Sequence, residues 1–219
     1  MSANAGPDIV EDGLVCCLDA NDPKSYNGSG STWFDRSGNT NATILNSPVF
    51  EDGYFSLNGT NQYFSVSGVV DFATADAFTV AIWAKSNSSL WSNYGFLISR
   101  RNQFVLHPSQ SSKNVNFYYY AGGWTAPVTY APDDITIWHQ YMFVYDNGIV
   151  DAYLDGELQG SGGNAANNLS STTNNTNIGF DSGTRYLDGD VGPVHMYNRK
   201  LTPDEVKQNY NATKSRFGK

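Results

Sequence analysis

Residues 138–159 contain the pattern that most restricts how this chain folds. Two turn sequences, Asp-Asn-Gly at 146–148 and Asp-Gly at 155–156, separate runs at 141–145 and 149–154 that are rich in aromatic and β-branched residues. Asn-Gly and Asp-Gly accept the positive φ angles that tight hairpin turns demand. The sequence therefore predicts a three-stranded antiparallel meander.

Eight further strand-like segments precede this meander at short spacing, and Asn, Gly, Ser and Pro are common between them. Hydrophobic residues make up 40% of the 219 residues and charged residues only 16%, while aromatics reach 14%, which favours short aromatic-rich strands. All-β units of this length occur as one domain. The predicted strands are 14–19, 42–45, 54–57, 63–66, 78–85, 96–100, 104–107 and 115–120.

The remaining segments differ in composition. Residues 1–13 have no periodicity and read as an N-terminal arm, while 160–177 are nearly all Gly, Asn, Ser, Thr and Ala and predict an exposed loop. A last strand is expected at 186–197, where Pro193 indicates a bulge or an edge position.

The C-terminal 201–219 segment contains the one helix that the sequence predicts. Thr202 and Glu205 form a capping box with proline at the first helical position, and Leu201 can pack on Val206 as a hydrophobic staple. Tyr210 lies one turn after Val206 on the same face. We expect a short helix laid against the strands.

Charge and cysteine usage limit the partners and the compartment. A net charge of −8 disfavours nucleic acid, and no apolar run approaches the roughly 20 residues that span a bilayer. Cys16 and Cys17 are adjacent, so they cannot form an ordinary bridge and are expected to pack as small hydrophobes in a non-oxidising compartment. The N-terminal residues lack the features of a signal peptide, so we expect synthesis and initial residence in a cytoplasm.

Four sequence blocks together resemble one known family. They are GLVCCLDA at 13–20, WFDRSGN at 33–39, FTVAIWAK at 78–85 and LDGDVGPVHMYNRKLT at 187–202. In this order they are similar to laminin-G-like domains of the concanavalin A-like lectin type. The resemblance implies an all-β fold, a two-sheet antiparallel jelly-roll β-sandwich over 14–200, with the short C-terminal helix packed on the same domain.

The ending QNYNATKSRFG at 208–218 is similar to the C-termini of laminin-G-like structural proteins of tailed phages, notably those of marine cyanobacteria. This narrower resemblance implies a component of the virion surface (capsid decoration, fibre or tail) made in a bacterial cytoplasm. Its partners would be other virion proteins and copies of itself, as a symmetric homo-oligomer such as a trimer. One departure is clear: many family members have an acidic pair where this chain has Gly192 and Pro193.

Nothing in the sequence forms a catalytic set, so we expect a protein that is not an enzyme. Glycoside hydrolysis needs two carboxyl groups about 5 to 10 Å apart, and the only four glutamates lie in the arm, in two turns and at the helix cap. An Asp188/Asp190 pair has the right alternation but is better explained by solvation of a turn and an edge. The three histidines and two cysteines lack triad or zinc spacing, which leaves a glycoside hydrolase as a remote alternative.

No cofactor is required, and calcium stays open as a structural ion. Calcium takes six to eight oxygen ligands, and five side chains lie in turns that this fold can bring together: Asp19, Asp35, Asn39, Asp188 and Asp190. Stabilisation of the Ser37-Gly38 turn by Asp35 and Asn39 is the competing interpretation.

Sugar binding is the main specific hypothesis besides a structural role. Aromatic rings stack on the apolar faces of sugars, and four candidates lie in or next to loops: Trp91, Tyr94, Trp124 and Tyr130, with Tyr118 and Tyr120 nearby. The alternative is that these rings cover the core or a subunit interface. Trp33, Trp83 and Trp138 are expected in the core. The sequence leaves two functions open: a virion surface protein that aids adsorption, and a lectin that binds host glycans.

Overall fold

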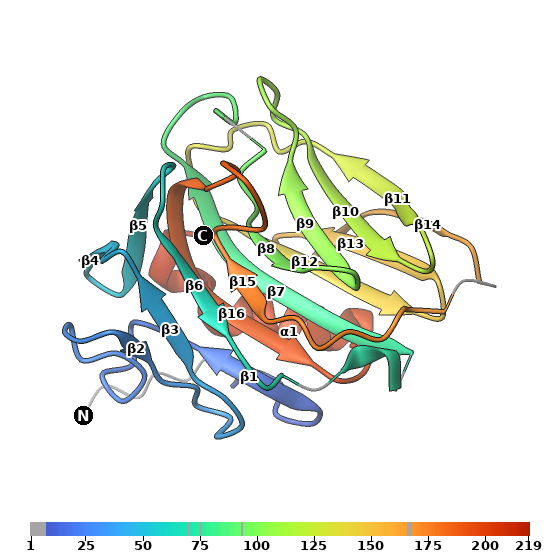
Figure 1. Cartoon of the computed structure of the whole chain (residues 1–219), viewed down its shortest axis with the longest axis horizontal. Coiled ribbons are helices and arrows are strands. Elements are labelled where there is room, and N and C mark those ends of the chain that lie inside the picture. The colour runs from blue at the N-terminus through green and yellow to red at the C-terminus, as the bar shows by residue number, and fades with distance from the viewer. Residues whose placement is uncertain (1–7, 70, 75, 93, 166–167) are drawn as a thin grey trace.

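The computed structural model describes residues 8–69, 71–74, 76–92, 94–165 and 168–219. Two antiparallel sheets lie face to face as a sandwich, and a short helix packs near the C-terminus (Figure 1). The predicted fold class is therefore confirmed. Within the described residues, no helix has the length and apolar character needed to cross a membrane.

Sheet A has the strand order β14-β13-β12-β7-β16-β5-β4, with β1 also paired to β16. The predicted meander is its β12-β13-β14 end, and Asn147 and Asp155 have the positive φ angles of 47° and 52° that the turn sequences required. The strands are β1 (Leu14–Leu18), β4 (Val49–Glu51), β5 (Tyr54–Asn58), β7 (Ala77–Ser86), β12 (His139–Asp146), β13 (Ile149–Leu154), β14 (Glu157–Gly163) and β16 (Asp188–Tyr197).

Sheet B has the order β11-β10-β9-β8-β15-β6-β3-β2. Its strands are β2 (Thr32–Trp33), β3 (Ala42–Leu45), β6 (Tyr63–Val66), β8 (Ile98–Arg100), β9 (Phe104–Pro108), β10 (Val115–Tyr120), β11 (Trp124–Tyr130) and β15 (Thr176–Ile178). A 3-10 turn, η1 (Phe72–Thr74), precedes β7. Aromatic rings fill the space between the sheets, as where Phe117 of β10 stacks on Phe143 of β12 with ring centroids 4.9 Å apart.

Pro193 marks a β-bulge in the middle of sheet A. The register of β16 against β7 shifts between Val191 and Val194, which is the bulge that the proline indicated. On its other side β16 pairs with β5 up to Val191 and with β1 from Val194 onward. The bulge therefore lies where β16 changes partner.

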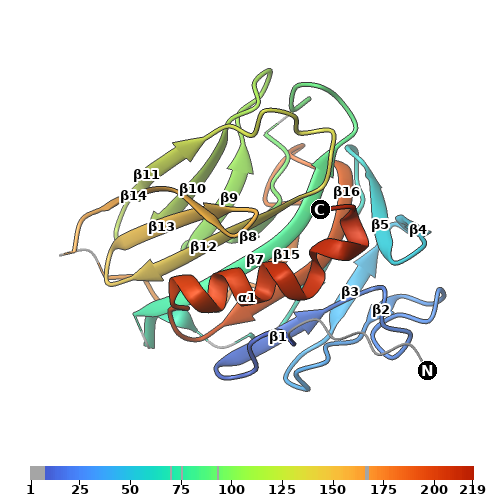
Figure 2. The ribbon, with the colours of Figure 1, turned by 180° about the vertical axis from the view of Figure 1, so that it is seen from behind.

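The helix α1 (Pro203–Thr213) covers the outer face of sheet A, as Figure 2 shows, and leads into the 3-10 helix η2 (Lys214–Phe217). The capping box of Thr202 and Glu205 is present, and Leu201 and Val206 share a buried cluster as the staple predicted. The arm expected at 1–13 is docked where it is described: Val10 is buried, and its N–H donates to Asn209 Oδ1 at 2.8 Å. Residues 1–7 lie outside the described residues.

Several expectations need correction. The segment 160–177 is not one exposed loop, because 160–163 belong to β14 and 176–177 to β15, each held by cross-strand pairing. Four strands were not predicted (β2, β4, β11 and β15), and Glu51 and Glu157 lie in strands rather than turns. Trp33 and Trp83 are fully buried, but Trp138 is only half-buried. Cys16 and Cys17 are buried free thiols, as expected.

Candidate functional site

The two faces of the sandwich differ in what covers them. The helix and the docked arm close the outer face of sheet A, whereas β10 and β11 of sheet B have outward-facing residues that reach solvent. A groove of about 280 Å³ opens on this side. We call it the sheet-B groove; it is lined by Phe96, Arg101, Val105, His107, Tyr118, Trp124 and Arg185.

The side chains that form the floor of this groove point outward because residues alternate along β10. Tyr119 points into the core, so its neighbours Tyr118 and Tyr120 lie on the outer face of β10. The rings of Tyr118 and His107 stack at 4.9 Å with their planes only 6° apart, and Phe96 packs against His107 at 4.9 Å. The floor is therefore built of packed aromatic rings.

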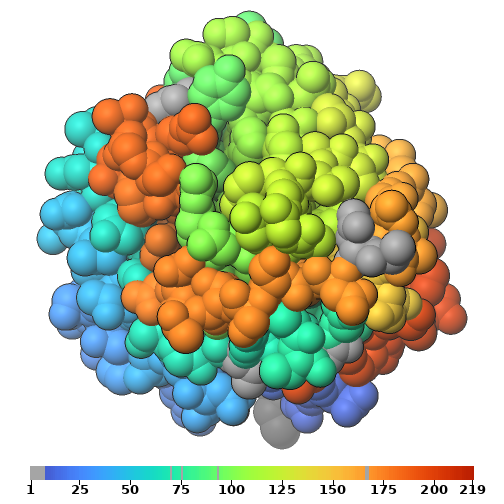
Figure 3. Space-filling model, turned by 45° about the vertical axis from the view of Figure 1, so that its right-hand side comes forward, coloured from blue at the N-terminus to red at the C-terminus, as the bar shows by residue number. Residues whose placement is uncertain are grey.

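Two arginines stand over aromatic rings at the sides of the groove. The Arg101 guanidinium lies 5.6 Å from the centre of the Trp124 ring, and that of Arg185 lies 5.6 Å from the ring of Tyr94. Figure 3 shows this side of the molecule. The green surface of residues around 95–107 lies in the middle, with the orange surface of residues around 183 on one side and the yellow-green surface of the β10–β11 hairpin on the other.

The charge of the groove is positive although the chain is acidic. Arg101 is paired with the buried Asp181 at 2.6 Å, and Arg185 has no ion-pair partner in the part of the chain that the structure describes. No Asp or Glu is among the described residues that line the groove. Burial lowers the pKa of His107, so this ring stays neutral at neutral pH. The groove therefore offers aromatic faces and one guanidinium free to bind an anion.

The structure separates the predicted aromatic residues into two groups. Trp124, Tyr118 and Tyr94 meet at the sheet-B groove, and Trp124 and Tyr94 are 37% and 41% exposed. Trp91 and Tyr130 are only 2% and 9% exposed and pack in the core, which leaves their ring faces no room for a ligand. The two arginines were not predicted, because residues 101 and 185 become neighbours only through the strand order of sheet B.

Four of the five side chains proposed for calcium, all of them carboxylates, have other partners in the structure, while Asn39 donates through its side-chain amide to Ser37 Oγ. Asp19 pairs with Arg216 at 2.5 Å and Asp190 with Lys85 at 2.9 Å, while Asp188 accepts a hydrogen bond from Asn87. Asp35 accepts hydrogen bonds from the backbone N–H groups of Ser37, Asn39 and Thr40 in the turn and of Cys17 in β1. Among the described residues, no group of three or more His, Cys, Asp or Glu side chains is arranged to hold a metal. The calcium hypothesis stays a prediction.

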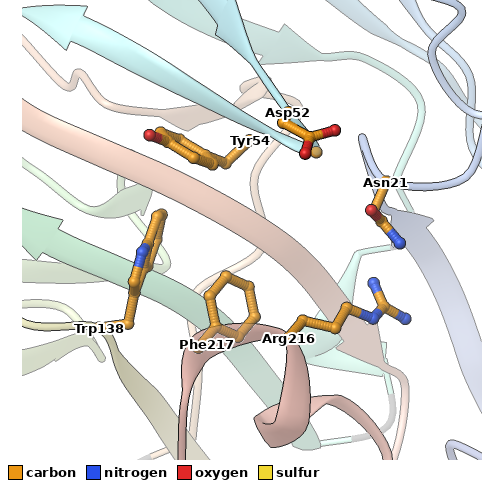
Figure 4. Close-up of a pocket in the computed structure, with 7 residues that line it drawn as sticks. Asn21, Asp52, Tyr54, Trp138, Arg216 and Phe217 are labelled. Atoms are coloured by element: carbon orange, nitrogen blue, oxygen red, sulfur yellow. The ribbon is translucent and has the colours of Figure 1, made fainter.

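A second cavity of about 300 Å³ lies at one end of the sandwich (Figure 4). We call it the end cavity; it is lined by Asn21, Asp52, Gly53, Tyr54, Trp138, Arg216 and Phe217. Sequence reasoning missed it because four separate segments form it. Trp138 was expected in the core, but it is only half-buried and lines this cavity. A tryptophan recognised as partly exposed would have indicated the site.

A comparison with protein families identifies the superfamily to which the chain belongs. A family model described as the concanavalin A-like lectin/glucanases superfamily matches residues 58–207, more than half of the chain. The chain belongs to this superfamily. No curated protein matches the chain significantly. The match begins in β5 and ends in α1, so it includes both walls of the sandwich and the strands that form the sheet-B groove.

Solved structures similar to this superfamily member include ligand-binding domains. Domain 4 of an extracellular GH43 arabinanase from Geobacillus stearothermophilus, in complex with arabinotriose, has a TM-score of 0.70 and 18% identity, covering 92% of this chain and 100% of that domain. The botulinum neurotoxin serotype D binding domain has a TM-score of 0.73 and 12% identity, covering 93% of this chain and 53% of its own. A neurotoxin DC binding domain in complex with SialylT has a TM-score of 0.71 and 12% identity, covering 92% and 52%.

These likenesses show the fold alone, because the identities are low. The chain spans about half the length of the neurotoxin binding domains, at 53% and 52%, and the whole of the arabinanase domain. The fold is thus one that lectins, glucanases and the binding modules of larger proteins share.

Proposed function

We propose that this chain is a carbohydrate-binding module and that its glycan site is the sheet-B groove. One observation carries the proposal: the outer face of sheet B gathers Trp124 and Tyr118 around a concave surface together with two guanidinium groups, above the buried ring of Phe96. Aromatic faces bind the apolar faces of sugar rings, and N–H donors bind hydroxyl and carboxylate oxygens. Similar domains that bind arabinotriose or SialylT support the assignment.

The charge of the groove favours an acidic glycan. Arg185 is exposed and unpaired among the described residues, and Arg101 keeps donors beyond the one that contacts Asp181. A guanidinium fork binds a carboxylate with two parallel hydrogen bonds, which a neutral hydroxyl cannot match. We therefore propose sugars that carry a carboxylate or sulfate as the preferred ligands.

We also propose that the module binds without cleaving. Acid/base hydrolysis of a glycosidic bond needs two carboxyl groups on either side of it. The described lining of the sheet-B groove contains none, and the end cavity contains one, Asp52. Glu205, the glutamate of the helix cap, lines neither of them and is paired with Arg199 at 2.7 Å.

For the place where the module works, we propose the virion surface of a tailed phage. The support is the sequence of 208–218, which is similar to the ends of phage structural proteins. Many copies on one particle would make a modest affinity for host glycans useful. Trp124→Ala phage that assemble but fail to adhere would support the glycan role, whereas failure of the variant to enter particles would support a structural one.

The direct test is a glycan array probed with the purified chain, with calcium and again with a chelator. We expect binding to acidic glycans that falls about five- to thirtyfold in Trp124→Ala, since stacking on one ring contributes about 1 to 2 kcal/mol. Phe34→Ala is the matched control, because Phe34 is 50% exposed and lines neither cavity. Equal binding by Trp124→Ala and the wild type would refute the assignment of the groove.

A further inference from the structure

We propose that the end cavity is a second carbohydrate site, separate from the sheet-B groove and suited to an uncharged sugar. It lies at the end of the sandwich where the chain after β1, the β4–β5 turn, the start of β12 and the C-terminal residues meet (Figure 4). Its aromatic and polar residues lie on opposite sides, as the two faces of a sugar ring require.

Three rings form the aromatic side. Tyr54 meets Trp138 edge to face at 5.1 Å, and Trp138 meets Phe217 at 4.8 Å. All three rings are half-buried, so part of each faces the cavity. The planes of Tyr54 and Trp138 are inclined by 75° and those of Trp138 and Phe217 by 47°, so the parts of the rings that line the cavity can meet the C–H groups on the apolar side of a pyranose or furanose.

The rings are held in place from behind. Phe217 stacks on the buried Trp83 at 4.3 Å, and Lys85 lies 5.5 Å from the centre of the Trp138 ring. Lys85 is in turn fixed by Asp190 at 2.9 Å. A site whose aromatic wall is ordered before the ligand arrives loses less entropy on binding.

The polar side consists of Asn21, Asp52 and Arg216, which Figure 4 shows across the cavity from Trp138. The side chains of Asn21 and Asp52 have no hydrogen-bond or ion-pair partner among the described residues. Arg216 pairs with Asp19 through one nitrogen and keeps its other donors. Gly53 makes this wall possible, because a Cβ there would lie 2.8 Å from Asn21 Oδ1.

These groups fit hydroxyls better than they fit an ion. A hydroxyl both donates and accepts, so it can donate to the Asp52 carboxylate and accept from the Asn21 amide or the Arg216 guanidinium. Lys85 and Arg216 are each paired with an aspartate, and Asp52 would repel an anion. The end cavity therefore differs from the sheet-B groove, which has a free cation and no lining carboxylate.

The experiment uses an array of neutral and acidic glycans with the full chain and four variants. Trp124→Ala removes the aromatic side of the first site, and Asp52→Ala and Glu51→Ala are each added to it. Glu51 is the matched control, since it is exposed and adjacent to Asp52 but does not line the cavity. Asp52→Asn, which keeps a hydrogen-bond acceptor, is expected to restore part of the binding.

We expect neutral glycans to remain bound by Trp124→Ala, to lose about tenfold or more in affinity with Asp52→Ala, and to be unaffected by Glu51→Ala. Loss of all neutral binding in Trp124→Ala, unchanged binding with Asp52→Ala, or no neutral binding by the wild type would each overturn the second site. Failure of the first site would show separately, as acidic-glycan binding that Trp124→Ala leaves intact.

Discussion

Phe217 stacks on Trp83 with ring centroids 4.3 Å apart and planes inclined by 23°, and this contact fastens the C-terminal residues to sheet A. Gly192 makes room for it, because a Cβ at this position would lie 3.0 Å from the Phe217 ring. The Trp83 indole N–H also donates to Thr213 Oγ1 at 2.9 Å. The glycine at position 192 is thus explained by the ring that packs above it.

Phe217→Ala is therefore expected to lower the free energy of unfolding by about 2 kcal/mol, less than a fully buried phenylalanine because Phe217 is half exposed. Urea denaturation followed by fluorescence measures this change. Phe34→Ala removes an equal side chain that makes no ring contact among the described residues and should change stability by less than about 0.5 kcal/mol. Similar losses in the two variants would contradict a specific anchoring role for Phe217.

Local turn and cap chemistry made much of this fold predictable. Asn147 and Asp155 identified the meander, and Thr202 with Glu205 identified the helix start, because these residues act through their immediate neighbours. β15 was missed because its Thr-Asn-Ile sequence becomes a strand only through pairing with β6 and β8. The secondary structure of such segments depends on tertiary contacts.

The sites were less predictable than the fold. Trp91 lies in a Ser- and Asn-rich segment that looks exposed, yet its N–H and carbonyl bond to 111–112 and carry the ring into the core. Trp124 was a candidate from the sequence, and it is an exposed aromatic residue. The two arginines of the groove were missed, because Arg101 and Arg185 are 84 positions apart in the sequence. Such convergence depends on strand order, which spacing along the chain does not encode.

His195 makes stability depend on pH. Burial lowers the pKa of His195 to about 4, so the folded protein keeps the ring neutral while the unfolded chain takes up a proton near pH 6.5. The unfolded state therefore binds more protons between these values, and stability falls as the pH drops from 6.5 to 4, by up to about 3 kcal/mol. Urea midpoints at pH 7.5, 6 and 5 measure this loss.

The His195→Gln variant provides the control for that pH profile. It should show a flatter dependence between pH 7.5 and 5, because glutamine has no proton to bind. Hydrogen bonds from His139 and Gln140 lower the pKa of the Asp155 carboxyl. Such carboxylates lose their contribution to stability only below about pH 4, so they fall outside this window. An equal slope in the variant and the wild type would show that other groups cause the effect.

Asp35 is expected to stabilise the fold through hydrogen bonds alone. Its carboxylate accepts bonds from the N–H groups of Cys17 at 2.6 Å, Ser37 at 2.9 Å and Thr40 at 3.0 Å, so Asp35→Ala leaves several donors unpaired and should cost about 3 kcal/mol. Asn39→Ala should cost less than about 1 kcal/mol, since among the described residues its side chain donates to Ser37 Oγ alone. Thermal melting with EGTA should match melting without it; a lower melting temperature that calcium restores would instead support the metal hypothesis.

Arg185 should set the preference of the sheet-B groove for acidic glycans. Its guanidinium is held above the rings of Tyr94 and Phe96 at 5.6 and 5.9 Å, and it has no carboxylate partner in the described chain, so a ligand carboxylate can bind it without displacing another anion. We expect Arg185→Gln to weaken binding of a carboxylate-bearing glycan about tenfold or more, with a smaller effect on its methyl ester, and to reduce the salt dependence of binding. Arg36→Gln is the matched control, because Arg36 pairs with Asp22 away from the groove. Isothermal titration of the free acid and the ester separates the two contributions: equal losses for both would mean that Arg185 supports the aromatic floor rather than recognising charge.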